Sequence, residues 1–461
     1  MKKLNTLILS LLIATTAFAQ QGFVHEKSSK YQWPTDPATL EKLAKWQDQK
    51  FGVLFHWGLY SVPGIVESWS ICSEDQDWIP RDSTMAYTDY KEWYWNLIDE
   101  FNPTDFDPNQ WSRIMKQAGM KYAIFTTKHH DGFSLFDTQY SDFSIMHGAF
   151  GDNEKANVAK HVFDAFRKDD FMVGAYFSKP DWHSPYYWWP RYATATRGVN
   201  YKIENHPQQW KKFQDFTYNQ IEELMTDYGD MDILWLDGGW VAAPRQDIKM
   251  DKIGDMAREK QPGILIVDRL IHGPNENYQT PERAVPEKQI PNPWESCIPL
   301  SDDWGWTPEA NFKSANEVVS TLAEIVAKGG CLLLGVGPSP QGLIIPEVEE
   351  RLLEIGAWLD KNGEAIYNTS TLPLYQSGQV WFTTNEEKGL NYAIYTIKEE
   401  DQEIPATIQW QGNTPSKGAK LRLVSNNKQV KFSVKGDVVE VQLPRSLRDK
   451  REPFALKFSA K

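Results

Sequence analysis

Short apolar runs alternate with longer amphipathic stretches between about residues 37 and 360. This alternation is typical of parallel strands joined by crossover helices. The expected strands cover residues 51–56, 122–127, 173–177, 232–236, 264–267 and 331–336. The expected helices, in which apolar residues recur at helical spacing, include 108–119, 160–168, 208–228 and 314–328. The pattern therefore predicts an α/β fold with a mainly parallel sheet.

The number of expected strands favours one architecture within this class. Six clear strands, with room for two weaker ones, predict a (β/α)₈ TIM-like barrel. A doubly wound sheet is the alternative. It is less favoured because no Gly-rich dinucleotide or phosphate loop follows an early strand.

The pattern changes after an expected helix at 345–361. Short strands separated by turn residues follow it, at 379–384, 390–397, 406–410, 420–424, 429–434 and 438–443. This spacing predicts a C-terminal antiparallel β-sandwich. We therefore expect a catalytic barrel at residues 20–365 and a β-sandwich domain at 366–461, which either braces the barrel or, as the weaker alternative, binds sugar.

The first residues have the order of a secretory signal peptide. Met1-Lys2-Lys3 is basic, an apolar run extends from Leu7 to Ala14, and the small-residue motif Ala17-Phe18-Ala19 follows. We expect residues 1–19 to be a signal peptide, which implies export to the periplasm or the medium. The net charge of −13 argues against nucleic acid and anionic membrane as partners.

Polar residues stand where the expected strands end. In a barrel of this type the catalytic residues lie at the carboxyl ends of the strands. The strand-end sequences are Phe55-His56-Trp57-Gly58, Lys128-His129-His130-Asp131-Gly132, Ser178-Lys179-Pro180-Asp181-Trp182, Trp235-Leu236-Asp237-Gly238-Gly239-Trp240 and Asp268-Arg269, with Trp294-Glu295-Ser296-Cys297 in the segment after them. We expect one edge of the barrel to carry the chemistry.

The residue types at this edge suit glycosidic cleavage, which needs one carboxyl group as nucleophile or base and another as proton donor. Asp237 is the better nucleophile candidate, because it follows an apolar run, precedes two glycines and has Arg269 available to keep it ionised. A metal hydrolase built on His129, His130 and Asp131 is the main enzymatic alternative. It is disfavoured because adjacent residues on a continuing strand point to opposite faces.

Four of these motifs resemble those of α-L-fucosidases in glycoside hydrolase family 29. They are Phe55-His56-Trp57-Gly58, Lys128-His129-His130-Asp131-Gly132, Leu234-Trp235-Leu236-Asp237 and Trp294-Glu295-Ser296-Cys297. The resemblance covers most of the mature chain. It implies retaining hydrolysis of terminal α-linked L-fucose from fucosylated glycans, no cofactor and no metal, and a barrel followed by a β-sandwich.

The resemblance also implies roles for single residues. Asp237 matches the family's nucleophile. The positions that match sugar-binding residues are His56, Glu67, Trp69, His129, His130, Tyr176, Trp235 and Arg269. Ser68 separates Glu67 from Trp69 where the family has an adjacent pair, so Glu92-Trp93 remains a rival for that match.

The acid/base residue has two candidates, because family members place it at different positions after the fifth strand. Glu295 stands beside a Trp and is two residues from Cys297, where burial would raise its pKa and keep it protonated as a proton donor should be. Glu282 follows Thr280-Pro281 in a polar loop. The sequence favours Glu295 narrowly.

Two other functions stay open at this point. One is a related retaining glycosidase that acts on galactose-configured sugars, because D-galactose and L-fucose share the arrangement of several hydroxyl groups. The other is a non-catalytic, exported sugar-binding barrel. The retained Asp237 and two spare Glu candidates argue against the latter.

Overall fold

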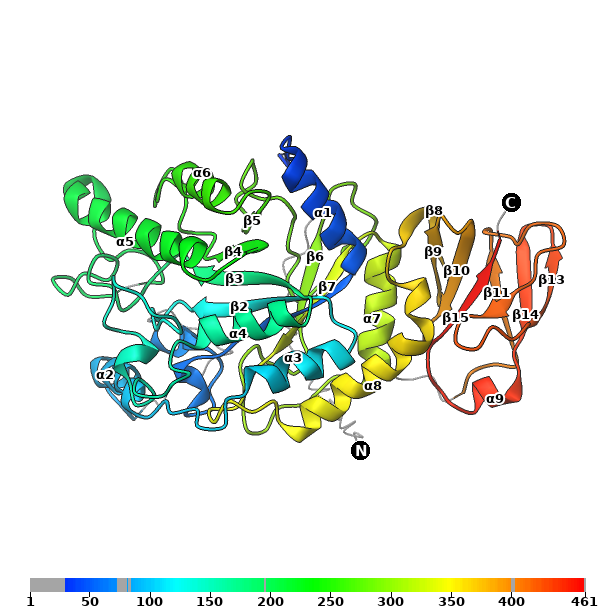
Figure 1. Cartoon of the computed structure of the whole chain (residues 1–461), viewed down its shortest axis with the longest axis horizontal. Coiled ribbons are helices and arrows are strands. Elements are labelled where there is room, and N and C mark those ends of the chain that lie inside the picture. The colour runs from blue at the N-terminus through cyan, green and yellow to red at the C-terminus, as the bar shows by residue number, and fades with distance from the viewer. Residues whose placement is uncertain (1–29, 73–80, 82–83, 195, 399–402, 460–461) are drawn as a thin grey trace, which may run out of the picture.

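The computed structural model describes residues 30–72, 81, 84–194, 196–398 and 403–459. The expected signal peptide at 1–19 lies outside these residues. A parallel sheet with surrounding helices forms the larger part of the molecule, and antiparallel strands form the smaller part at the C-terminal end (Figure 1).

Seven parallel strands form the central sheet in the order β5-β4-β3-β2-β1-β7-β6. Their bounds are β1 Phe51–Phe55, β2 Tyr122–Lys128, β3 Met172–Ser178, β4 Ile233–Asp237, β5 Leu265–Asp268, β6 Glu295–Pro299 and β7 Cys331–Val336. Six of them coincide with the expected strands within one or two residues. The seventh, β6, begins at Glu295 in the segment that the sequence pattern did not assign to a strand.

The segment 275–283 bonds to both outer strands of this sheet, although it forms no regular strand. On one side, the Asn277 N–H donates to the Ile266 carbonyl of β5 at 2.8 Å. On the other side, the Glu295 and Cys297 N–H groups of β6 donate to the Gln279 and Pro281 carbonyls at 2.8 and 3.0 Å. The curled sheet with this segment therefore fits a (β/α)₈ barrel in which residues 275–283 take the place of one strand.

Helices cover the outside of the sheet. Their bounds are α1 Pro37–Gln49, α2 Tyr87–Asn96, α3 Pro108–Gln117, α4 Val158–Lys168, α5 Pro207–Thr226, α6 Met250–Lys260, α7 Ala315–Ala327 and α8 Pro346–Asn362. The expected helices correspond to α3, α4, α5, α7 and α8. Contacts join α6 to α5, α4 to α3, α3 to α8 and α8 to α7. The helices therefore lie around the sheet in the same order as the strands that precede them in the chain.

Alternate residues of the strands enter two different apolar clusters. Residues such as Val53 and Phe125 pack outward against the helices, whereas Leu54 and Ile124 pack into the interior of the curled sheet. This alternation follows from the two-residue period of a strand. At the amino ends of the strands, Trp46 of α1 stacks on Tyr278 with ring centroids 4.0 Å apart, so α1 closes that end of the interior.

The C-terminal part consists of two antiparallel sheets, ordered β12-β15-β10-β9-β8 and β11-β14-β13. Their bounds are β8 Ser370–Ser377, β9 Val380–Asn385, β10 Leu390–Tyr395, β11 Thr407–Gln411, β12 Arg422–Leu423, β13 Lys431–Lys435, β14 Val438–Gln442 and β15 Phe454–Phe458, with the short helix α9 Arg445–Arg448 before β15. Side chains of both sheets share one apolar cluster, which includes Phe382, Trp410 and Val439. This arrangement fits the expected β-sandwich.

Two strands of this part were missed in the sequence. β8 contains Pro373 and an irregular register between Thr371 and Gln376, which suits an edge strand but hides the strand pattern. β15 is a single short apolar run that follows Pro453, with a charged segment between it and the strand before it.

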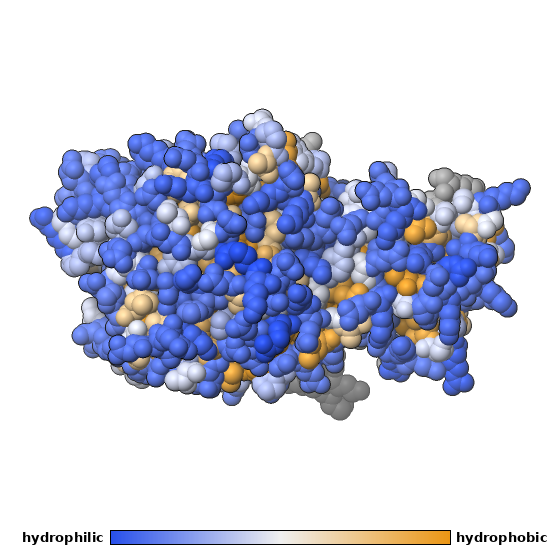
Figure 2. All heavy atoms as spheres, in the orientation of Figure 1, coloured by the Kyte–Doolittle hydropathy of each residue, from blue (hydrophilic) through white to orange (hydrophobic). Residues whose placement is uncertain are grey.

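The face shown in Figure 2 is hydrophilic over most of the helices, with small apolar patches mainly around the C-terminal part. None of the described helices is both long and apolar enough to cross a membrane.

Candidate active site

Asp237 is the last residue of β4 and lies at the carboxyl edge of the sheet. Its Oδ2 accepts a hydrogen bond from the Tyr176 hydroxyl at 2.7 Å, and its Oδ1 accepts one from the Gly238 N–H at 2.8 Å. Gly238 has φ +86°, and a Cβ there would lie 2.3 Å from Pro180, so the turn that presents Asp237 requires glycine. The side chain remains 18% exposed.

Arg269 joins Asp237 to a second carboxylate. One terminal nitrogen of its guanidinium donates to Asp237 Oδ1 at 2.8 Å, and the other donates to Glu282 Oε2 at 2.8 Å. Its Nε donates to the Thr280 hydroxyl at 3.1 Å, which fixes the plane of the group. The two carboxylates therefore face the same small space, and Glu282 is 27% exposed there.

Electrostatics keep Asp237 ionised. Burial raises the pKa of this carboxyl. The Arg269 guanidinium, His130 and the hydrogen bonds from Tyr176 and Gly238 outweigh that effect, so the pKa lies well below its ordinary value. A carboxylate that is ionised at every working pH has the charge state that a nucleophile needs.

Three imidazoles line the same edge. The ring of His130 lies 4.3 Å from that of His129, and the ring of His56 lies 5.5 Å from that of His129. Burial lowers the pKa of His129 to about 4 and the pKa values of His56 and His130 well below the ordinary value. All three are therefore neutral near pH 7, which lets each ring both donate and accept hydrogen bonds.

Glu67 and Trp69 also lie at this site. Trp69 belongs to the short 3₁₀ helix Ser68–Ile71, and Glu67 is the residue directly before that helix. Trp69 packs edge-on against the His130 ring at 5.1 Å. Burial raises the pKa of Glu67 to about 8, against the opposing effect of Arg283 and with a further increase from Glu282. Glu92, the rival for this match, is exposed on α2.

Some polar atoms of this cluster have no protein partner. Among the described residues, His56 Nδ1, His130 Nδ1 and Glu67 Oε1 are buried without a hydrogen bond. Glu67 also has φ +51°, a strained conformation for a residue other than glycine. Buried unpaired groups on a strained backbone are typical of a site that binds a polar ligand.

Tyr176 and Trp235 lie beneath the cluster, inside the curled sheet. Tyr176 contacts Asp237 directly, as described above. The Trp235 indole supports the Arg269 guanidinium, which lies 4.6 Å above the ring, and its Nε1 donates to Glu295 Oε1 at 3.2 Å. Trp235 therefore links the edge of the sheet to its interior.

Glu295 does not join Asp237 at the carboxyl edge. It is the first residue of β6, its exposed fraction is 0%, and its Oε2 accepts a hydrogen bond from Tyr122, the first residue of β2. Burial raises its pKa to about 8, as the sequence predicted. The same burial places the carboxyl deep in the interior, toward the amino ends of the strands.

Several other acidic residues at strand ends serve the fold. Asp131 accepts hydrogen bonds from the Tyr94 hydroxyl at 2.7 Å and the Phe133 N–H at 3.1 Å. Asp181 pairs with the buried Lys128 at 3.0 Å, and Asp268 pairs with Lys179. These residues anchor the loops that follow β2, β3 and β5.

The orientation of His129 and His130 differs from the one expected for adjacent residues on a continuing strand. β2 ends at Lys128, so the two following rings lie side by side at the same edge and do not point to opposite faces. His129 Nδ1 is 2.5 Å from the Ser68 hydroxyl, and Asp131 is turned toward Tyr94. The described residues contain no group of three or more His, Cys, Asp or Glu side chains arranged to hold a metal ion.

Two other residues at the site, Trp304 and Arg283, were not singled out from the sequence, whereas Trp182 and Trp240 stand in the strand-end sequences. Trp304, in the loop after β6, lies 5.2 Å from the His56 ring, and the Arg283 guanidinium lies 5.4 Å from the Trp304 ring. Trp182 and Trp240 pack against His130 at 5.2 Å each. The sequence indicates a site position for Trp182, Trp240 and Trp304, because each of them follows a strand. No local sequence signal indicates one for Arg283.

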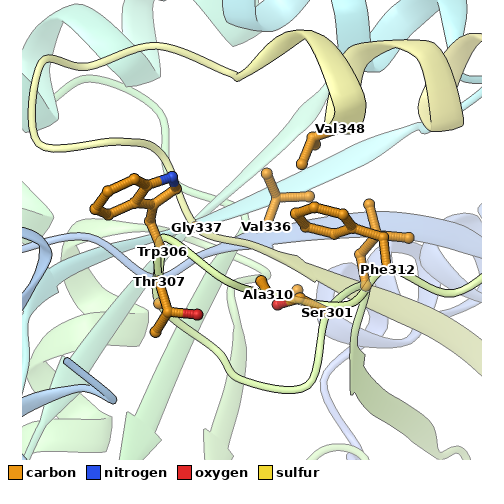
Figure 3. A pocket seen from close by; sticks show the side chains of 11 residues that line it. Ser301, Trp306, Thr307, Ala310, Phe312, Val336, Gly337 and Val348 are labelled. Atoms are coloured by element: carbon orange, nitrogen blue, oxygen red, sulfur yellow. The ribbon is translucent and has the colours of Figure 1, made fainter. Parts of the chain in front are cut away.

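The loop after β6 also borders a small pocket with about 280 Å³ of empty space (Figure 3). Apolar side chains such as Trp306, Phe312 and Val348 line it together with the polar residues Ser301 and Thr307. No carboxylate or imidazole occurs among the described residues that line it. The residue types suited to glycosidic cleavage therefore lie in the Asp237 cluster and not in this pocket.

The cluster combines an ionised carboxylate, a second carboxylate on the same arginine, neutral imidazoles and several indoles. A carboxylate pair of this kind can break a glycosidic bond, while imidazoles and indoles suit sugar hydroxyls and apolar sugar faces.

Comparison with known proteins agrees with this chemistry. The family model described as alpha-L-fucosidase matches residues 18–364 of the chain. The human plasma alpha-L-fucosidase is 29% identical over 376 residues, which cover 77% of this chain and 76% of that protein.

Solved structures agree as well. Alpha-L-fucosidase isoenzyme 1 from Paenibacillus thiaminolyticus aligns with a TM-score of 0.77 at 28% identity and covers 92% of this chain and 100% of that one. The Thermotoga maritima alpha-fucosidase in complex with fucose aligns with a TM-score of 0.71 at 26% identity and covers 93% and 100%.

Proposed function

The chain belongs to the α-L-fucosidase family, glycoside hydrolase family 29, and we propose that it removes terminal α-L-fucose from glycans with retention of configuration, using Asp237 and Glu282. Membership makes the protein a glycoside hydrolase that cleaves α-L-fucosyl bonds. The roles of Asp237 and Glu282 in this reaction are the part that we propose.

The observation that carries this assignment is the shared guanidinium of Arg269. Two carboxylates that contact the two ends of one guanidinium lie close enough to act on the two sides of a single glycosidic bond. A retaining mechanism requires a separation of roughly 5–5.5 Å between the two carboxyl groups. The side chains of Asp237 and Glu282 are 18% and 27% exposed, which supports access of a substrate to both carboxyl groups.

We assign the acid/base role to Glu282, the alternative candidate of the sequence, and not to Glu295. A proton donor must reach the leaving oxygen within hydrogen-bond distance. Glu295 has no exposed surface and already accepts hydrogen bonds from Tyr122 and Trp235. Its raised pKa is a property of the barrel interior, where no glycosidic oxygen can enter without displacing these rings.

In the first step, Asp237 Oδ2 or Oδ1 attacks the anomeric carbon of fucose as the bond to the leaving oxygen breaks. Protonated Glu282 gives its proton to that oxygen, so the aglycone leaves as an alcohol and Glu282 becomes a carboxylate. The product is a fucosyl ester on Asp237. The ester no longer carries the charge that Arg269 paired with.

In the second step, the roles of the two residues reverse. Glu282, which the first step left as a carboxylate beside Arg269, now acts as the base. Glu282 takes a proton from water, the water oxygen attacks the anomeric carbon, and the ester bond to Asp237 breaks. Free fucose leaves, Asp237 is a carboxylate again and Glu282 is protonated again.

We assign sugar contacts to the remaining polar groups of the cluster. Neutral His56, His129 and His130 serve as hydrogen-bond partners of the fucose hydroxyls, and the unpaired atoms of His56, His130 and Glu67 support that role. Tyr176 holds the orientation of Asp237. Trp69 packs beside His130, whereas Trp235 supports Arg269 from below.

We further propose that the protein is exported after loss of residues 1–19 and that the barrel and the β-sandwich meet near residues 365 and 366. The basic, apolar and small-residue order of the N-terminus supports export. The change from α8 and the 3₁₀ turn Gly363–Ala365 to β8 supports the boundary.

The purified enzyme tests this function with p-nitrophenyl α-L-fucoside, compared with p-nitrophenyl β-D-galactoside. We expect hydrolysis of the fucoside at a kcat/KM at least tenfold higher than that of the galactoside. Proton NMR of the first product formed should show the α-anomer of fucose. Initial release of the β-anomer would overturn the retaining mechanism, and absence of fucoside hydrolysis would overturn the function.

A further inference from the structure

Ser68 is a buried residue of the site to which the proposed reaction gives no role. It is the first residue of the 3₁₀ helix Ser68–Ile71 and stands between Glu67 and Trp69 in the chain. Its hydroxyl oxygen lies 2.5 Å from Nδ1 of His129. The exposed fractions of Ser68 and His129 are 0% and 3%, so this contact joins two groups that are removed from bulk solvent.

The ring of His129 is also held by its aromatic neighbours. Tyr176 stacks on it with ring centroids 5.9 Å apart and an angle of 14° between the planes. Tyr60 lies edge-on to it at 5.7 Å. Such packing fixes the plane of the ring, but it does not distinguish a nitrogen from a carbon atom. The hydrogen bond to Ser68 therefore selects between the two flipped orientations of the imidazole.

The same contact determines which ring nitrogen carries the proton. Burial lowers the pKa of His129 to about 4, so the ring is neutral near pH 7 and has one N–H. Among the described residues, Nδ1 of His129 is the one acceptor to which the Ser68 hydroxyl is hydrogen-bonded. A proton on Nδ1 would leave the buried hydroxyl hydrogen without a partner, which costs free energy. Ser68 therefore donates to an unprotonated Nδ1, and the ring proton lies on Nε2.

The protonated nitrogen, Nε2, is available to a ligand. Among the described residues, no protein group is hydrogen-bonded to it. The neighbouring imidazoles of His56 and His130 each have a buried Nδ1 without a partner. A sugar hydroxyl that accepts a hydrogen bond from Nε2 keeps its own hydrogen, which it can donate to a second group of the site.

We infer that Ser68 is a positioning residue, which holds His129 in the tautomer with the proton on Nε2 and so makes this imidazole a hydrogen-bond donor to a hydroxyl group of fucose. The contact with fucose rests on the proposed function. The tautomer rests on the contact between Ser68 and His129 alone. Ser68 therefore acts on the sugar through His129 and does not touch it.

Nitrogen NMR of the full chain measures the tautomer directly. The protein carries ¹⁵N-labelled histidine and is studied without substrate, because the protonated and the unprotonated nitrogen of a neutral imidazole have well-separated chemical shifts. Couplings to the ring hydrogens distinguish Nδ1 from Nε2, and His129→Gln identifies the signals of His129. We expect an unprotonated Nδ1 and a protonated Nε2. A protonated Nδ1 in the unmodified enzyme overturns the inference.

Two alanine substitutions in the same helix test the role of the hydroxyl. Ser68→Ala removes the donor to Nδ1. Ser70→Ala is the matched control, because Ser70 is 1% exposed and its hydroxyl is buried without a hydrogen bond among the described residues. Each change removes one oxygen atom, and circular dichroism confirms that both variants are folded. Ser68→Ala should shift the His129 signals toward a mixture of the two tautomers, whereas Ser70→Ala should leave them unchanged.

Kinetics with p-nitrophenyl α-L-fucoside measure the effect on the sugar. Ser68→Ala should raise KM about tenfold and change kcat by less than about threefold, because the donor is lost in the bound substrate and in the transition state alike. Ser70→Ala should change both constants by less than about twofold.

The outcomes separate the inference from the proposed function. Equal KM values for the two alanine variants overturn the role of Ser68. Absence of fucoside hydrolysis by the unmodified enzyme overturns the proposed function instead, and the NMR signals of His129 still decide whether Ser68 sets the tautomer.

Discussion

At the scale of residues, the guanidinium of Arg269 contacts both carboxylates to which we assign catalytic roles. Arg269 contacts Asp237 and Glu282 at 2.8 Å each and rests on the Trp235 indole. This contact, together with His130 and Tyr176, overcomes the burial that would raise the pKa of Asp237. One side chain therefore contacts both the proposed nucleophile and the proposed acid/base residue.

The assignment of Glu282 predicts a selective loss of activity. Glu282→Ala should lower kcat/KM for natural fucosides by about 10²- to 10⁴-fold. With an activated aryl fucoside, azide should restore turnover and yield α-L-fucosyl azide, because a small anion can reach the fucosyl ester once the carboxylate is removed. Rate measurements with and without azide, with NMR of the product, check this.

Glu295→Gln is the contrasting variant. It keeps the shape of the buried side chain and should retain activity within about tenfold, without any response to azide. If Glu295→Gln instead abolished activity on natural fucosides while Glu282→Ala preserved it, the two roles would have to be exchanged.

The buried carboxyl of Glu295 also predicts a pH dependence of stability. Its pKa is raised from 4.5 to about 8, so the folded state binds this proton more tightly than the unfolded state does. The stabilisation is complete below about pH 4.5 and is lost as the pH rises through about 8. Between these values, one such group lowers the free energy of unfolding by up to roughly 1.4 kcal/mol per pH unit.

Urea unfolding at pH 5, 6, 7 and 8 measures this slope. Glu295→Gln carries no proton to lose, so the variant should show a shallower decline than the unmodified protein. Glu67 has a similarly raised pKa and contributes to both proteins alike. Equal slopes for the two proteins would show that Glu295 is not held protonated.

The sequence named most residues of the candidate site, and it gave the proposed acid/base residue, Glu282, as its second choice. Asp237, Arg269 and the histidines follow predicted strands, so their position could be read from the apolar pattern. The sequence narrowly favoured Glu295 over Glu282, because the depth of Glu295 inside the barrel cannot be read from it. That depth depends on β6 beginning at Glu295, which no local apolar pattern marks.

At the scale of elements, the segment 275–283 explains why the described residues of the barrel form seven regular strands and not eight. Its backbone bonds to β5 and to β6 and carries Thr280 and Glu282 to the site. The segment is polar, and Pro281 interrupts it, so periodicity cannot reveal it. The regular strands and helices were predictable because each buries an apolar face.

The closure of the amino end of the sheet by α1 predicts a large effect on stability. Trp46 is fully buried and stacks on Tyr278. Trp46→Ala should lower the free energy of unfolding by about 3–5 kcal/mol, since it removes a large buried ring and leaves a cavity. Chemical denaturation monitored by circular dichroism measures the change.

Trp33→Ala is the matched control, because Trp33 is among the most exposed large apolar side chains of the described residues. It should change the free energy of unfolding by no more than about 0.5 kcal/mol. A loss below about 1 kcal/mol for Trp46→Ala would show that α1 does not close the interior.

The barrel and the β-sandwich form one unit at the scale of the whole molecule. Trp381, Tyr392, Ile394 and Ala455 of the sandwich belong to the same apolar cluster as the outer barrel residues. The Trp358 indole of α8 donates to the Pro453 carbonyl at 2.7 Å. The smaller cluster around Trp410 is internal to the sandwich.

This shared core predicts cooperative unfolding. Scanning calorimetry of the full chain should show one transition, with a calorimetric enthalpy close to the van't Hoff enthalpy. Separation of the parts would expose apolar faces on both of them. Two well-separated transitions would contradict the shared core and indicate that the sandwich folds independently.

The central claim is that Asp237 carries fucose as a covalent ester. 2-Deoxy-2-fluoro-α-L-fucosyl fluoride slows both steps of a retaining reaction, and its good leaving group lets the ester accumulate. Incubation followed by peptide mass spectrometry should show one 2-fluorofucosyl group per chain, on the peptide that contains Asp237, in the unmodified enzyme and not in Asp237→Asn. An adduct on a different residue, or catalytic turnover of fucosides by Asp237→Asn at the unmodified rate, would contradict the account.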